Sequence, residues 1–479
     1  MSLPNKAKIA LLAPFTIKGL DKALYEECKK IALDAEFFTA EYEKIYEEIL
    51  SSQSDLKKFM PDISILLTDG ESGDSRLPER EDIFIYDLKN LFFKYGKYNV
   101  VDDKLRYIGN IVVKPEYLPK LAHELMAYVK AKFSKNRKCI ALDLDNTLWG
   151  GIVGEDGFEG IALDTKAPGN AYLEFQKSLL ELNKRGIILA IASRNNYEDA
   201  IKVVREHPYM QLREDNFASI QIDWSDKVAQ IKKIAEEVNI GLDSIVFFDD
   251  DALNRELVRQ ALPEVLVADM PKDPALYLRA LKEINDFETL QSLRGIFTEE
   301  DLKRSEMYVA QRKANELKSQ FSNMEDFLKS LEMKINIEKA NDFTIPRIAQ
   351  LTQKTNQFNL TTKRYAESDI RNFAKNQDFE VFSVDVKDKF GDHGIVGAFI
   401  AKNEGSKIVV DTFLLSCRVI GRNIENRMVE FIKEKAKERG ASEIVGQYIP
   451  TPKNSICKDV YKNCGFGESE NNLFKFEVA

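Results

Sequence analysis

The chain has 479 residues, too long for one ordinary domain, and predicts roughly three domains of about 150 residues each. Its 44% hydrophobic and 31% charged residues are typical of a globular protein, and a formal net charge of −9 argues against a nucleic-acid surface. No apolar run approaches the ~20 residues that span a bilayer, and residues 1–6 lack the pattern of a secretory signal, so we expect a cytoplasmic protein with no membrane span.

Cysteine and histidine usage limits the kinds of metal site. No two of the five cysteines form a C-x-x-C pair, so neither a zinc site nor a disulfide framework is indicated. Three histidines are too few for a histidine-rich metal site. Any bound metal is therefore expected to have oxygen ligands, as Mg²⁺ or a similar hard cation does.

Residues 1–133 predict a small α/β domain. Apolar runs alternate with helical patterns, which favours a parallel sheet, and no catalytic signature is present. The polar stretch 69–75 is interpreted as a loop, and the basic stretch 132–138 as a linker. The predicted strands are 6–13, 37–39 and 62–67, and the predicted helical segments are 18–33, 45–59, 81–95 and 115–133.

The segment 134–290 opens with an apolar strand that runs into two acids, Asp143 and Asp145. If the strand persisted, both carboxylates would point the same way, because successive side chains alternate faces. Two carboxylates at such a short distance repel each other, and a bound divalent cation usually offsets this repulsion. An ordinary turn after a strand would give the same short motif, so the motif needs its context.

Polar residues recur at the ends of later apolar strands. Ser193 follows a strand over 187–192, and Asp249 and Asp250 follow a strand over 244–248. Lys227 lies between them, in the first turn of a predicted helix; a lone lysine is more often solvated. Taken together, the repeated arrangement is hard to explain by packing. The remaining predictions are a tight glycine hairpin over 150–157 and a helix over 169–184.

This order of motifs resembles the haloacid dehalogenase (HAD) superfamily of phosphotransferases. The four motifs correspond to Asp143–Thr147, Ser193, Lys227 and Asp249–Asp250. The resemblance implies a Rossmann-like domain with a parallel sheet, a phosphorylated substrate and an aspartyl-phosphate intermediate. The longer text L-D-L-D-N-T-L-W-G-G-I-V-G-E-D-G is similar to the FkbH-like branch, in which a HAD domain is fused to an acyltransferase-like domain.

The resemblance implies separate roles for the matching residues. Asp143 would be the nucleophile, and Asp145 would protonate the leaving oxygen and later deprotonate water. Ser193 would hydrogen-bond a phosphoryl oxygen, and Lys227 would offset charge on the nucleophile and the phosphate. Thr147 would be a structural hydroxyl near the phosphate.

The metal site implied by the resemblance is a Mg²⁺ site formed by Asp143, Asp249, Asp250 and the main-chain carbonyl of Asp145. One departure concerns 249–254, D-D-D-A-L-N, where FkbH-like proteins commonly have D-D-N-P-x-E. Asp249 and Asp250 match the acids that bind the metal in the family. The residues after them differ, so the resemblance does not extend to substrate contacts in this loop. No large cap fits between the motifs, so we expect an open site that suits a large or carrier-linked substrate, or a site that a neighbouring domain closes.

Residues 291–330 predict a helical connector, and residues 331–479 an α+β domain. Strands over 333–337, 380–386, 394–401 and 407–415 and helices over 343–357 and 424–438 are expected. The segments 353–359, 390–394 and 416–422 are similar to the FkbH-like family, and 459–466 resembles the closing helix and strand of a GNAT acyltransferase.

The last domain has weaker candidate residues for acyl transfer. The resemblance implies that some relatives transfer a glyceryl group to an acyl carrier protein. Cys417 could hold the thioester, although a buried structural cysteine is the more frequent alternative. His393 is a candidate base or a loop-capping residue. Arg418 and Arg422 precede a helix N-terminus, where a pyrophosphate can bind.

Three functions therefore remain open. The leading hypothesis is a Mg²⁺-dependent phosphatase or phosphotransferase. The second is an acyl-loading enzyme that couples dephosphorylation to transfer, and the third is a non-catalytic scaffold.

Overall fold

The computed structural model describes residues 6–69, 82–133, 135–290, 292–295, 299–318, 321, 324–416, 419–451, 453–469 and 472–478. The chain divides into two compact units. The first comprises Met1–Ile187, Glu206–Gln211 and Gly241–Leu302, and the second Ile188–Arg205, Leu212–Ile240 and Lys303–Ala479. The domain boundaries at 133, 290 and 330 stay predictions.

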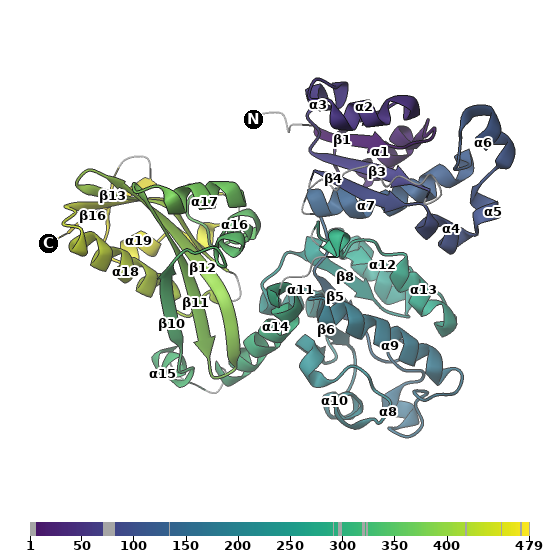
Figure 1. Cartoon of the computed structure of the whole chain (residues 1–479). Helices are drawn as coiled ribbons and strands as arrows, with labels where there is room; N and C mark the ends of the chain where they lie inside the picture. Colours follow the sequence, from purple (N-terminus) through teal and green to yellow (C-terminus); the bar gives the residue numbers. More distant parts are fainter. Residues whose placement is uncertain are drawn as a thin grey trace. The chain divides into compact units, whose positions relative to one another are not determined.

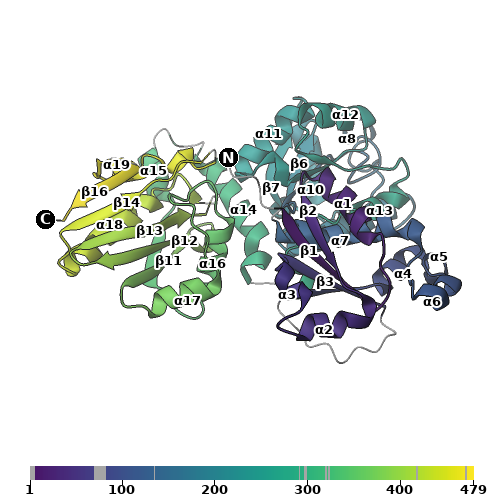
Figure 2. The ribbon, with the colours of Figure 1, turned by 90° about the horizontal axis from the view of Figure 1, so that it is seen from above.

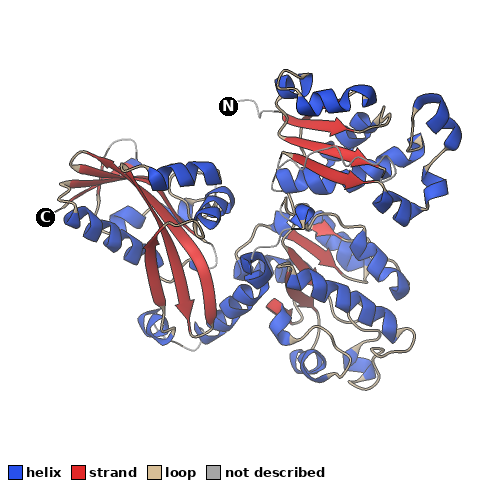
Figure 3. Ribbon diagram, in the orientation of Figure 1, coloured by secondary structure: helices blue, strands red, loops and turns tan. Residues whose placement is uncertain are grey.

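The N-terminal part of the first unit is a four-stranded parallel sheet with helices on both faces (Figures 1 and 3). Side chains of β1 alternate: Ile9 and Leu11 pack with α1 and α7, and Ala10 and Leu12 pack with α2 and α3. The predicted parallel architecture is confirmed. The strands, in sheet order, are β2 (Ala35–Thr39), β1 (Ala7–Leu12), β3 (Ile63–Thr68) and β4 (Ile83–Asp87); the helices are α1 (Leu20–Lys30), α2 (Ile45–Leu50), α3 (Asp55–Phe59) and α7 (Leu118–Lys132).

The helix expected over 81–95 is wrong in its first half, where β4 lies. Phe84 and Tyr86 are buried while Ile85 is 53% exposed, so this stretch follows the two-residue period of an edge strand. Helix α4 (Lys89–Tyr95) starts only after Asp87, whose carboxylate accepts the N–H of Lys89. Two short helices follow, α5 (Lys97–Val100) and α6 (Asp103–Gly109). Part of the loop expected over 69–75, and part of the linker over 132–138, lie outside the described residues.

The middle of the chain contributes buried parallel strands to both units. In the first unit β5 pairs with β8, and β8 with β9; in the second unit β6 pairs with β7. The predicted parallel strands are confirmed. The elements are β5 (Cys139–Leu142), β8 (Ile245–Phe248), β9 (Leu266–Val267), α9 (Gly169–Lys184), α12 (Ala252–Ala261) and α13 (Tyr277–Lys282), and, in the second unit, β6 (Ile188–Ser193), β7 (Phe217–Ile222), α10 (Tyr197–Glu206) and α11 (Lys227–Val238).

The glycine-rich segment after β5 is not the simple hairpin expected over 150–157. Gly150 forms an isolated antiparallel bridge with Ala162, but a short helix, α8 (Val153–Asp156), lies between them. The Asp156 carboxylate accepts the N–H of Ile152 at 2.8 Å, a contact that supports this helix. We call residues 149–162 the flap. No larger insertion occurs within the fully described stretch 135–290, so the expected absence of a large cap is confirmed.

The C-terminal part of the second unit is an α+β domain with a seven-stranded sheet (Figure 2). All of its pairings are antiparallel except β13 with β14, which α18 connects. Helices α16 and α17 pack on one face, and α18 and α19 on the other. The expected α+β class is confirmed. In sheet order the strands are β10 (Lys334–Lys339), β11 (Phe379–Asp388), β12 (Gly391–Glu404), β13 (Lys407–Leu415), β14 (Glu443–Gln447), β16 (Leu473–Glu477) and β15 (Gly467–Glu468); the helices are α16 (Ile345–Lys354), α17 (Glu367–Lys375), α18 (Ile424–Glu438) and α19 (Val460–Asn463).

The expected connector forms α14 (Glu299–Lys318) and α15 (Met324–Ser330). Arg312 of α14 is 7% exposed and donates to the carbonyl of Phe217 at the start of β7, which gives the connector a structural contact. None of the described helices combines the length and the apolar character that crossing a bilayer requires.

Candidate active site

Three aspartates meet where β5 and β8 end. Asp143 directly follows β5, and its N–H donates to the carbonyl of Phe248, the last residue of β8, at 2.9 Å. This pairing holds the two strand ends side by side. Ligand oxygens of Asp143, Asp249 and Asp250 all lie within 4.8 Å of one another. Three carboxylates at that spacing match the oxygen donors that a hard divalent cation requires.

The electrostatics of this acid cluster favour a bound positive charge. Burial, reinforced by the charges of Asp143 and Asp249, raises the pKa of Asp250 from 3.8 to about 7. Asp143 is 7% exposed and Asp249 is fully buried, so solvent screens the repulsion poorly. A proton or a cation relieves this repulsion, and above neutral pH a divalent cation is the more effective of the two.

Asp145 differs from Asp143 in its surroundings. The two side chains were expected to point the same way only if the strand continued through them. Strand β5 ends at Leu142, before both acids, so this expectation does not apply. The Oδ1 atom of Asp145 accepts the indole N–H of Trp149 at 2.8 Å and the N–H of Val153 at 3.0 Å. Its carboxylate is thereby oriented by the flap and is not one of the three clustered acids. The metal contact expected of its main-chain carbonyl stays a prediction.

Thr147 fixes the turn that carries the second pair of acids. Its side chain is fully buried, and its Oγ1 accepts the N–H of Asp250 at 3.2 Å. This hydrogen bond agrees with the structural role expected for the hydroxyl. Its contact with a phosphate stays a prediction.

Sequence reasoning missed Arg255, which stabilises the same turn. One guanidinium nitrogen donates to the carbonyl oxygens of both Asp249 and Asp250 at 2.7 Å. Asn254, in the loop that departs from the FkbH-like text, lies 3.3 and 3.4 Å from the two carboxylate oxygens of Asp249. The segment that differs from the FkbH-like sequence therefore still contributes a contact to the Asp249 carboxylate. A strand-to-helix turn followed by an arginine in the first helical turn was the only signal in the sequence.

Ser193 and Lys227 come together within the second unit. Ser193 ends β6 and is 1% exposed; Lys227 begins α11, is 2% exposed, and donates to the carbonyl of Ala192 at 2.7 Å. The alternative of a solvated lysine is therefore wrong. Gln230, also missed, donates to the carbonyl of Ser193 at 2.9 Å. How Ser193 and Lys227 face the acid cluster stays a prediction.

A second buried cluster lies in the C-terminal part of the second unit. Nε2 of His393 lies 2.8 Å from Oδ2 of Asp388, and Arg422 donates to the same oxygen. Oδ1 of Asp388 accepts the N–H of Phe390 at 2.8 Å. Burial opposes ionisation of Asp388, but His393 and Arg422 outweigh it and lower the pKa of this carboxyl.

This cluster changes the interpretation of the acyl-transfer candidates. His393 is 1% exposed, and its ring contacts the Asp388 carboxylate, so this histidine belongs to a buried polar cluster and does not only cap a loop. Arg422 is 7% exposed and ion-paired to Asp388, not open to a ligand. Cys417 and Arg418 lie outside the described residues.

Comparison with known proteins identifies a phosphatase-like domain at the acid cluster. Residues 135–269 match the family described as Acid Phosphatase. The N-terminal part of protein BF1531 from Bacteroides fragilis, described as containing a phosphatase domain complexed with Mg, is 29% identical with a TM-score of 0.55; the match covers 60% of this chain and 94% of that chain.

Other solved structures match a smaller share of the chain. The ribosomal-protein-S18-alanine N-acetyltransferase from Escherichia coli is 9% identical, with a TM-score of 0.25, and the match covers 30% of this chain and 95% of that chain. The GNAT domain of S. lividans PAT is 14% identical, with a TM-score of 0.25, and the match covers 30% of this chain and 90% of that chain. No curated protein matches the chain.

Proposed function

We propose that this protein is a Mg²⁺-dependent phosphatase or phosphotransferase of the HAD type that works through an aspartyl-phosphate. The cluster of Asp143, Asp249 and Asp250 carries this proposal, because it supplies a nucleophile and a cation site at one place. The acid phosphatase match over 135–269 and the Mg-bound structural relative support it.

In the proposed reaction an oxygen of Asp143 attacks phosphorus and forms the acyl-phosphate bond. The phosphorus–oxygen ester bond breaks, and the electron pair goes to the leaving oxygen, which takes a proton from Asp145. The same carboxylate then removes a proton from the water that attacks phosphorus and frees Asp143. The contacts with Trp149 and Val153 hold Asp145 in one orientation for both steps. A bound Mg²⁺ would offset the charge of nucleophile and phosphate.

Ser193 and Lys227 are proposed to bind the transferring phosphoryl group. Lys227 is nearly fully buried at 2% exposure, and a buried ammonium group needs anionic or carbonyl partners. One partner is the carbonyl of Ala192, next to Ser193. The phosphate would provide another.

The proposed substrate is large or carrier-linked. After the first motif only the flap and its four-residue helix α8 are inserted, and between Ser193 and Lys227 lie α10, a short 3-10 turn and β7. An open entrance accepts a phosphate presented on a bulky molecule.

Phosphate release from p-nitrophenyl phosphate with Mg²⁺ tests the proposal. We expect Asp143→Asn to lower the rate at least about 10³-fold, because the amide cannot act as the nucleophile. The matched control is Asp103→Asn, at an exposed aspartate in α6. Absent release by the native chain, or equal rates for Asp143→Asn and the native chain, would contradict the proposal.

A second candidate is an FkbH-like acyl or glyceryl transferase that couples dephosphorylation to loading of an acyl carrier protein. The hydrogen-bonded pair Asp388 and His393 supports it, because a carboxylate can orient a histidine that acts as a general base. Intact mass after incubation with an acyl phosphate should then show an adduct that Cys417→Ala abolishes. Retention of the adduct would exclude Cys417. The third alternative, a scaffold, is disfavoured because the acids, Ser193 and Lys227 are all present.

A further inference from the structure

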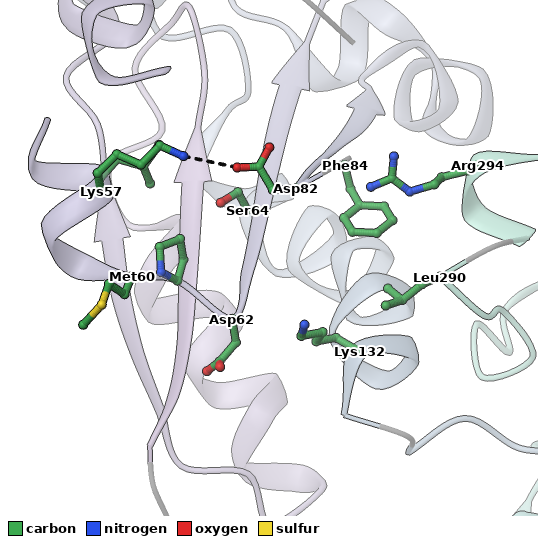
Figure 4. A pocket seen from close by; sticks show the side chains of 11 residues that line it. Lys57, Met60, Asp62, Ser64, Asp82, Phe84, Lys132, Leu290 and Arg294 are labelled. Atoms are coloured by element: carbon green, nitrogen blue, oxygen red, sulfur yellow. Dashed lines mark hydrogen bonds and ion pairs between the residues drawn. The ribbon is translucent and has the colours of Figure 1, made fainter. Parts of the chain in front are cut away.

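A cavity of about 480 Å³ opens in the N-terminal part of the first unit, apart from the acid cluster (Figure 4). It lies at the amino ends of β3 and the edge strand β4. Its wall includes the side chains of Leu56, Phe84 and Leu290. The volume is that of a small-molecule site, and the lining combines apolar side chains with charged ones on both sides.

Ser64 contributes a hydroxyl group to this wall. Its side chain is 4% exposed and lines the cavity. Among the described residues its hydroxyl has no hydrogen-bond partner. This hydroxyl can donate a hydrogen bond to a ligand in the cavity that carries an acceptor.

The charges in the cavity favour an anion. Both carboxylates already have donors: Asp62 accepts the N–H of Lys8 at 2.7 Å, and Asp82 pairs with Lys57 at 3.3 Å. In Figure 4 the carboxylate of Asp62 points away from the other labelled side chains. The three cations of the lining, Lys57, Lys132 and Arg294, outnumber the two acids, so the cavity carries an excess of positive charge.

The opposite side of the cavity is basic and aromatic. Figure 4 shows Arg294 beside Phe84, with Leu290 and Lys132 below them. The guanidinium carbon of Arg294 lies over the Phe84 ring, 4.1 Å from its centre, which is a cation–π contact. A flat apolar group fits against this side, and an anionic group fits next to the two cations.

We propose that this cavity binds a small organic anion, with a flat apolar body against Phe84 and Leu290 and a carboxylate or phosphoryl group held by Lys132, Arg294 and Ser64. The site is separate from the proposed phosphatase site. It gives the N-terminal domain a ligand of its own, and its test does not depend on catalysis.

The test is a titration of the full chain, labelled with ¹³C at the methionine methyl groups, with benzoate, phenylphosphonate and benzyl alcohol. Met60 lines the cavity, and its resonance is assigned by its loss in Met60→Leu. Met270 lies outside the cavity and serves as the internal reference. We expect a saturable shift of Met60 with one or both anions and a weaker effect of the neutral alcohol.

Two variants and a control locate the anion. Lys132→Gln and Arg294→Gln should each weaken anion binding about two- to fivefold, the range of an exposed ion pair. Lys135→Gln, at an exposed lysine that does not line the cavity, should leave binding unchanged. An unmoved Met60 resonance, equal affinity for benzyl alcohol, or unchanged affinity in both cavity variants would overturn the proposal.

Discussion

Two carboxylates of this protein, the half-buried Asp250 and the buried side chain of Asp388, have opposite pKa directions. Burial and the neighbouring acids Asp143 and Asp249 raise the pKa of Asp250 to about 7. Burial also opposes ionisation of Asp388, but the hydrogen bond of His393 and the charge of Arg422 lower its pKa. Because burial raises the pKa of both groups, the opposite directions come from the partners that the chain supplies.

The two sites differ in whether the chain itself balances their negative charge: it does so at Asp388, and it does not at the acid cluster. The Asp388 carboxylate receives two charged or polar side chains and main-chain N–H groups, so its charge is neutralised within the fold. The acid cluster places negative charge against negative charge, and a cation from solution has to provide the balance. Substitutions should therefore affect stability at Asp388 and cation binding at the acid cluster.

The largest effect on stability is expected at the cluster of Asp388, His393 and Arg422. Arg422→Met leaves the buried carboxylate of Asp388 with one fewer cation and should lower the free energy of unfolding by about 3 kcal/mol. Urea unfolding measures it. The matched control is Arg427→Met, whose exposed ion pair with Glu434 should contribute less than about 1 kcal/mol. Equal effects of the two substitutions would show that the buried cluster is not a source of stability.

A smaller effect is expected at the turn that holds the metal acids. Arg255→Gln removes the clamp on the carbonyls of Asp249 and Asp250 and should weaken Mg²⁺ binding about 10–100-fold, as loss of a supporting contact does at other metal sites. Calorimetric titration measures the affinity. Arg259→Gln, one turn further along α12 and paired with Asp269 on the surface, is the control. An affinity equal to the native one in Arg255→Gln would exclude this supporting role.

The smallest effect concerns pH. Without a divalent cation the folded Asp250 holds a proton between pH 3.8 and about 7 that the unfolded carboxyl has released, so the free energy of unfolding should fall as pH rises through this interval. The slope should stay below about 1.4 kcal/mol per pH unit, because Asp250 is partly exposed and solvent screens the repulsion.

Unfolding curves at several pH values, with EDTA and with Mg²⁺, check this pH dependence. Mg²⁺ should remove the fall at high pH, and Asp250→Asn should remove it without Mg²⁺. A slope that is the same in Asp250→Asn and the native chain would assign the dependence to another group.

The sequence predicted those features that depend on short-range patterns. Uninterrupted apolar runs predicted β5, β6 and β8, because strands buried on both faces have that composition. The polar residues that follow them were correctly placed at strand ends, and Asp143, Asp249 and Asp250 do meet. The helices over 169–184 and 424–438 match α9 and α18 at both ends.

Features that depend on distant partners could not be predicted. Asp388 and Arg422 are 34 positions apart, and only the fold of the α+β domain brings them together. Strand β4 was misassigned because its apolar run continues into α4, so periodicity alone did not separate the two elements. Helix α8 was missed because the glycines around it favoured a turn, whereas Asp156 caps this short segment.

Calorimetric titration of Mg²⁺ into the native chain and into Asp250→Asn tests the central claim most directly. We expect one Mg²⁺ site per chain, with proton release near neutral pH as Asp250 ionises, and a loss of at least about tenfold in affinity in Asp250→Asn. Asp103→Asn should bind as the native chain does. No Mg²⁺ binding by the native chain, or equal affinity in Asp250→Asn, would contradict the assignment of the acid cluster as a cation site.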